Sequence, residues 1–148
     1  MVFKINIGTK TGKTYKLEGD FKFLIDKAIG DKFEGKELQE NLEGYEFEIA
    51  GASDKSGFMA SPEVEGAGIK RVLLTYGKGM HKRPKREGKK NQSTPRPKGL
   101  RLRKTLRGKM ISEDIRQINL KIAKFGKTTI DEVFNPKTEE PKTEEKAE

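Results

Sequence analysis

The chain of 148 residues contains no cysteine and no tryptophan. Without cysteine it forms neither a disulfide nor a thiolate zinc site, and a reducing compartment is permitted. The N-terminal sequence MVFKINIGTKTGK lacks the continuous apolar stretch of a secretory signal, and no apolar run approaches the length that spans a membrane. We therefore expect a soluble, cytoplasmic protein that does not act at a membrane.

Catalytic motifs are also scarce. The GKT tripeptide near the N-terminus lacks the upstream glycine of a phosphate loop, and GDKFEGK is followed by Glu37 where the magnesium-binding Ser or Thr belongs. The only histidine, His81, has no partnered carboxylate or serine nearby in sequence. Ser53 and Asp54 are explained more simply by turn hydrogen bonds than by an active site. We expect no enzyme, no cofactor, no metal and no small-molecule substrate.

Positive charge is concentrated in one stretch of the chain. Residues 78–109, here called the basic segment, hold fourteen Lys or Arg and one acid, Glu87, for a net charge of +13. The whole chain carries +9, so the remainder sums to −4. This asymmetry favours a polyanion as partner. A solvated run or a localisation signal is the alternative, but guanidinium groups suit bidentate phosphate contacts and base stacking.

Residues 98–110, KGLRLRKTLRGKM, overlap the end of the basic segment and hold six Lys or Arg and no acid. If this stretch is extended around residues 100–103, its leucines and its arginines lie on opposite faces of the strand. The segment has only four large apolar side chains, so we expect it to become rigid only on its partner. The candidate polyanion-binding residues are Lys82, Arg83, Lys85, Arg86, Lys89, Lys90, Arg96, Lys98, Arg101, Arg103, Lys104, Arg107 and Lys109.

Alternation of apolar and polar residues indicates a mainly β protein, α+β at most, with a small β-barrel-like body. Residues 3–7 and 15–17 predict a hairpin around a Gly-bearing turn. Residues 44–51 and 69–77 are rich in β-branched or aromatic side chains and predict two further strands. Residues 118–122 alternate as in a strand, although the isoleucines of this region would also mark a helical face.

The remaining stretches are loops, turns and a tail. Residues 21–29 are ambiguous between a helix and a strand, and we favour a short helix or turn. A long loop is expected between the strands at 44–51 and 69–77. Residues 128–134 suggest one last helical turn. One domain therefore spans residues 1–134, and residues 135–148, with a repeated PKTEE and a charge of −2, form a disordered acidic tail.

Three stretches carry a resemblance to a known family. GYEFEIAGASDKSGF, RVLLTYGKG and LRLRKTLRGKMISEDIRQINLKI resemble the small-subunit ribosomal protein S-six family of the archaeal and eukaryotic type, from the first strand to about Phe134. The chain departs from the family pattern at Ala52, where a Gly is usual, and at Met59 and Ala60, where a Pro-Met pair is usual. The long basic C-terminal helix of eukaryotic members has no counterpart, so the chain resembles the archaeal members.

The resemblance implies a structural constituent of the small ribosomal subunit, with ribosomal RNA and neighbouring ribosomal proteins as partners. Under this interpretation the basic segment tracks RNA and reads its shape and backbone more than its base sequence. Two alternatives remain open. The first is a free-standing RNA chaperone or translation factor. The second is an adaptor that binds an acidic protein or an anionic membrane.

Overall fold

The computed structural model describes residues 2–80, 99–126 and 130–134. In chain order the elements are β1 (Phe3–Gly8), β2 (Thr14–Gly19), the 3-10 turn η1 (Lys22–Leu24), β3 (Lys32–Glu34), the 3-10 turns η2 (Gly35–Glu37) and η3 (Glu40–Leu42), β4 (Glu46–Asp54), β5 (Ile69–Thr75), β6 (Arg101–Arg107), β7 (Ile115–Lys124) and α1 (Ile130–Phe134). The expected mainly β class is confirmed. No helix in the described ranges is long and apolar enough to cross a membrane.

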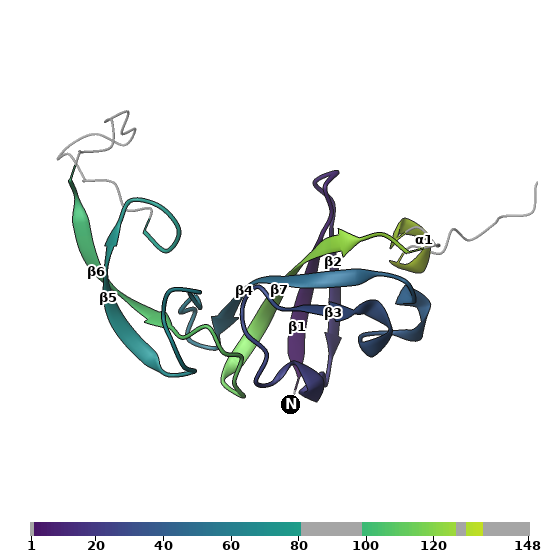
Figure 1. Ribbon diagram of the computed structural model, residues 1–148, viewed down its shortest axis with the longest axis horizontal. Coiled ribbons are helices and arrows are strands. Elements are labelled where there is room, and N and C mark those ends of the chain that lie inside the picture. The colour runs from purple at the N-terminus through teal and green to yellow at the C-terminus, as the bar shows by residue number, and fades with distance from the viewer. Residues whose placement is uncertain (1, 81–98, 127–129, 135–148) are drawn as a thin grey trace, which may run out of the picture.

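Five strands form the main sheet in the order β2-β1-β7-β4-β3 (Figure 1). β1 runs parallel to β7, and the other neighbours are antiparallel. The alternation in β1 places Phe3, Ile5 and Ile7 in the core with no exposed surface. β4 contributes Phe47 and Ile49 to the same core. The alternation that is visible in the sequence therefore brings these apolar side chains together in the core of the body.

β5 and β6 form a separate two-stranded ribbon, here called the arm, which projects away from the main sheet (Figure 1). The two strands are antiparallel and form seven residue pairs, from Ile69 opposite Arg107 to Thr75 opposite Arg101. The expectation that the basic segment orders only on its partner is therefore wrong for residues 101–107. Pairing with β5 satisfies the backbone groups along one edge of β6, and that long-range ladder offsets the entropy of ordering the strand.

The expected hairpin at 3–17 and the strands near 44–51, 69–77 and 118–122 are confirmed, as is the helical turn before residue 134. Several boundaries differ, since β5 ends at Thr75 rather than at 77 and β7 runs from Ile115 to Lys124. The strand predicted to end at 51 continues as β4 to Asp54, because residues 51–54 pair with β7 across two register shifts. The loop before β5 is correspondingly shorter.

The segment 21–29 contains only the 3-10 turn η1, and the short strand β3 follows it. A helix cannot continue because Asp26 has a positive φ of 69°. The backbone N–H groups of Asp26 and Ile29 instead donate to the carbonyls of Ile111 and Lys109, both at 3.0 Å. Backbone pairing with a distant segment has thus replaced local helix hydrogen bonds.

Candidate nucleic-acid interface

The predicted RNA-binding residues divide into two groups. Arg101, Arg103, Lys104 and Arg107 lie on β6, and Lys109 follows the strand. The other eight lie outside the described residues: Lys82, Arg83, Lys85, Arg86, Lys89, Lys90, Arg96 and Lys98. The residues of β6 are therefore the part of the predicted interface whose geometry is known.

One face of the arm is basic. Residues directly opposite each other in an antiparallel pair share a face, so Arg101, Arg103 and Arg71 lie on the same side of the ribbon. All three are exposed, and none makes an ion pair or side-chain hydrogen bond with another residue in the described ranges. Ile69 and Leu73 lie on this face and are each half exposed. The face therefore offers three unpaired guanidinium groups between aliphatic side chains.

Arg71 was not among the predicted residues. It lies on β5, outside the basic segment, and only the cross-strand register places it opposite Thr105 and beside the arginines of β6. The strand pattern of residues 69–77 places it on the same strand face as Leu73. That pattern was a usable signal, but the partner strand could not be identified from sequence.

Arg107 has a different environment from the other arginines of β6. It is only 7% exposed, at the root of the arm. Its Nε donates to Oδ2 of Asp54 at 2.8 Å, and one terminal nitrogen donates to Oδ2 of Asp114 at 2.9 Å. The other terminal nitrogen donates to the carbonyl of Ala67 at 3.1 Å and to Oγ of Ser112 at 3.3 Å. Every guanidinium nitrogen therefore has an internal acceptor.

The charges of this cluster reinforce each other. The backbone N–H of Ser56 and then the Arg107 guanidinium lower the pKa of the Asp54 carboxyl, although burial acts in the opposite direction. Hydrogen bonds from Arg107 and then Lys55 lower the pKa of Asp114. Burial opposes the charge on Arg107, yet hydrogen bonds to the two aspartates raise its pKa. All three groups are therefore charged at neutral pH.

Lys109 lies just beyond this cluster. Its ammonium group is 3.7 Å from a carboxylate oxygen of Glu65, whose side chain is exposed. A pair of this kind contributes little to stability, because the Glu65 side chain is 86% exposed and water screens its charge. Lys109 is therefore held loosely and can exchange its partner for another anion.

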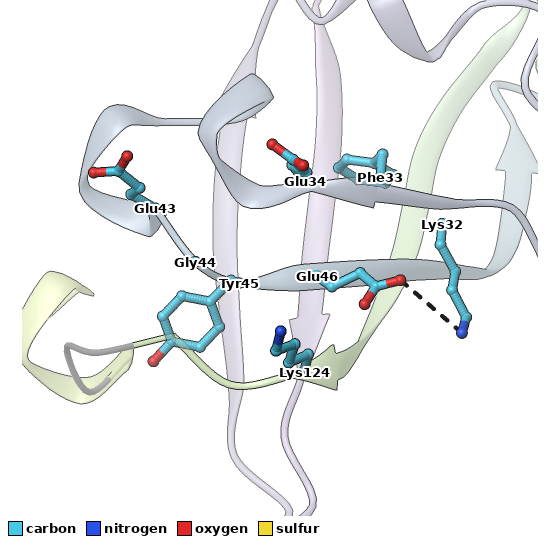
Figure 2. Close-up of a pocket in the computed structure, with 8 residues that line it drawn as sticks. All are labelled: Lys32, Phe33, Glu34, Glu43, Gly44, Tyr45, Glu46 and Lys124. Atoms are coloured by element: carbon cyan, nitrogen blue, oxygen red, sulfur yellow. Dashed lines mark ion pairs between the residues drawn. The ribbon is translucent and has the colours of Figure 1, made fainter.

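Two of the cavities lined by described residues differ in charge. The one beside the arm has a volume of about 500 Å³ and contains three cationic side chains and no carboxylate in its lining. The other, of about 620 Å³, lies at the far end of the sheet and is drawn in Figure 2. Three glutamates and two lysines line it, and Lys32 pairs with Glu46 at 4.0 Å. Its surplus of carboxylates disfavours a polyanion there.

Neither cavity holds the donors of a metal site. Among the described residues, no group of three or more His, Asp or Glu side chains is placed to bind a metal ion. The chemistry that the described surface supports is thus electrostatic binding by the arm and its adjoining cavity.

Comparison with known proteins gives a consistent result. Residues 3–135 match the family model described as Ribosomal protein S6e. The chain is 41% identical over 127 residues to the small ribosomal subunit protein eS6 of Methanococcus maripaludis, covering 85% of this chain and 90% of that protein. It is 40% identical over 125 residues to the eS6 protein of Methanocaldococcus jannaschii, covering 84% of each chain. For Archaeoglobus fulgidus the identity is 37% over 143 residues, covering 94% of this chain and all of that one.

Proposed function

The chain belongs to the Ribosomal protein S6e family, and from that membership we propose that it is a structural constituent of the small ribosomal subunit. The resemblance noted in the sequence is confirmed, and so is the expectation that the chain is not an enzyme, because its relatives are ribosomal proteins. Its site of action is the ribosome of the cytoplasm. The named relatives are archaeal, in agreement with the archaeal type that the resemblance indicated.

We further propose that the chain binds ribosomal RNA through the basic segment and the basic face of the arm. The observation that supports this most directly is the set of exposed arginines Arg71, Arg101 and Arg103, which have no acidic partner among the described residues. Unpaired guanidinium groups on a rigid ribbon suit phosphates, because the fork binds two oxygens at once. Arg107 is outside this interface, since its nitrogens bind the protein itself.

A stable ribosomal constituent is distinguished from a transient factor by how it survives a salt wash. The chain should co-sediment with small subunits after washing at high salt, whereas a chaperone or translation factor would be released. Replacing Arg71, Arg101 and Arg103 by Gln should weaken incorporation. A matched control replaces three exposed body lysines that form no ion pair with another described residue, Lys10, Lys16 and Lys36, and should incorporate normally. Equal incorporation of both variants would contradict the proposed interface.

The alternative partner is an acidic protein or an anionic membrane. Ribonuclease treatment of the captured complexes separates these cases. Binding through RNA is lost on digestion, while binding to a protein or lipid surface persists.

A further inference from the structure

The cavity beside the arm combines apolar and cationic groups in one place. Residues 57–59, residues 78–79 and one edge of β6 surround it. Its volume of about 500 Å³ falls in the range of roughly 300–1,000 Å³ that pockets for small organic groups occupy. Its lining residues are Gly57, Phe58, Met59, Lys78, Gly79, Arg103, Lys104, Thr105 and Leu106.

The apolar side of this cavity depends on Gly79. A Cβ at that position would lie 3.2 Å from Leu74, 3.3 Å from the sulfur of Met59 and 3.4 Å from Leu106. Its φ of +80° is also one that side chains rarely adopt. The chain thus turns closely over Leu106, which is buried, and Phe58 is only half buried beside it. An aromatic ring and a thioether therefore remain accessible above a packed floor.

The β6 edge of the cavity carries unpaired peptide groups. One edge of β6 is paired with β5, and the other is bridged only at Arg107, which pairs with Ala60. The carbonyl of Met59 accepts from the backbone N–H of Arg107 at 3.0 Å, and residues 103–106 pair with no further strand in the described part of the chain. The backbone donors and acceptors of Arg103 and Thr105, which by strand alternation face away from β5 as those of Arg107 do, can therefore hydrogen-bond a planar polar group.

The cations complete the site. Lys78, Arg103 and Lys104 line the cavity, and none of them makes an ion pair with any other described residue. A ligand that fits must therefore be anionic on one side and flat and polar on the other. A nucleotide has this composition, because its base can stack on an aromatic ring and its phosphates can form ion pairs with cationic side chains. Bases in a duplex are stacked on each other, so only an unpaired nucleotide can enter.

We propose that this cavity receives one unpaired nucleotide of a bound RNA strand, with its base against Phe58 and its flanking phosphates at Lys78, Arg103 and Lys104. The inference rests on the proposed RNA binding and adds to it a preference for RNA with an extruded or single-stranded nucleotide. The arm supplies general attraction to phosphates, and the cavity selects the position at which the RNA is open.

The test compares two RNA hairpins that differ by one bulged uridine. The full chain should bind the bulged hairpin more tightly, and Phe58→Leu should reduce that preference by about fivefold to 150-fold, the range for losing one stacked base. Phe58→Trp keeps an aromatic face and should retain the preference. Because Leu keeps an apolar side chain at this position, Phe58→Leu should remain folded. Its melting temperature checks this. Phe125→Leu, at an exposed phenylalanine outside the cavity, is the matched control.

Different results would contradict the nucleotide cavity and the proposed RNA binding. Salt-dependent binding with equal affinity for both hairpins, or a bulge preference untouched by Phe58→Leu, overturns the cavity assignment alone. Absence of any RNA binding overturns the proposed function as well. Binding of an extended poly-glutamate peptide that competes with RNA, without a bulge preference, would assign the β6 edge to a protein strand instead. A 4-thiouridine placed at the bulge should crosslink to the peptide that contains Phe58 and Met59.

Discussion

Arg107 and Asp54 lie 53 positions apart in sequence, and a hydrogen bond of 2.8 Å joins the Nε of one to Oδ2 of the other. Each lies in one of the sequence blocks that resemble the family, GYEFEIAGASDKSGF and LRLRKTLRGKMISEDIRQINLKI. The two blocks therefore meet at the root of the arm. Their shared feature is an internal ion pair that fixes the arm to the body, in addition to any contact with RNA.

Removing Arg107 should destabilise the fold, because it leaves the buried Asp54 without a counter-charge. We expect Arg107→Met to lower the free energy of unfolding by about 3–5 kcal/mol, the range for breaking a buried pair. The double variant Arg107→Met/Asp54→Leu should recover part of this loss, since no isolated charge remains. Urea denaturation measures both. Lys4→Met, which breaks the exposed pair with Glu18, is the control and should cost less than about 1 kcal/mol.

The same pair predicts a dependence of stability on acid. The pKa of Asp54 is lowered in the folded chain from an ordinary value of 3.8, chiefly by the Ser56 N–H. The contribution of the ionised Asp54 carboxyl to the free energy of unfolding is therefore complete above pH 3.8. It is lost as the pH falls through the lowered pKa of the folded chain. The difference in unfolding free energy between the wild type and Asp54→Asn should be constant near neutrality and shrink below pH 3.8. A difference that stays constant into that acidic range would contradict this assignment.

Gly108 predicts a second sensitive position at the arm root. It is buried, and a Cβ added there would collide with the backbone of Gly66. We therefore expect Gly108→Ala to lower the melting temperature strongly, because neither backbone can retreat cheaply. Gly68→Ala is the matched control, since nothing lies within 4 Å of its Cβ position and Gly68 belongs to the same junction. Equal melting temperatures of the two variants would show that the junction tolerates a shift.

The body was predictable because its signals are local. Alternation in residues 3–7 identifies a strand wherever its partners lie, and the same holds for residues 118–122. The arm was not predictable, because β6 is ordered by its pairing with β5. Even the two paired residues nearest in sequence, Thr75 and Arg101, are 26 positions apart. The charge of the segment obscured its strand pattern.

The candidate site shows the same division between local and long-range signals. The sequence locates the positive charge of Arg101 and Arg103, since composition alone reveals it. It cannot distinguish them from Arg107, whose partner Asp54 is far along the chain. Arg71 was overlooked for the complementary reason, because it joins the basic face only through cross-strand pairing.

The salt dependence of RNA binding tests the contribution of the arm. If roughly six phosphates are neutralised, the slope of log affinity against log salt should be about −4, at roughly 0.7 per contact for single strands. Replacing Arg71, Arg101 and Arg103 by Gln removes three contacts and should flatten the slope by about 2. The Lys10, Lys16 and Lys36 control should leave the slope unchanged. An unaltered slope in the arginine variant would place the phosphate contacts elsewhere.

Truncation tests where the proposed single domain ends. Residues 135–148 lie outside the described residues, and their composition predicts that removing them leaves folding and subunit incorporation nearly intact. Removing residues 130–148 should be different, because it also deletes Ile130, which is buried in the core, and Phe134, whose ring stacks on Tyr15 at 5.2 Å. Burial of two such side chains contributes about 1.5–3 kcal/mol each when complete. The longer truncation should therefore melt at a clearly lower temperature than the shorter one. Loss of incorporation in the shorter truncation, with its melting temperature unchanged, would mean that residues 135–148 bind a partner and that the functional unit extends beyond residue 134.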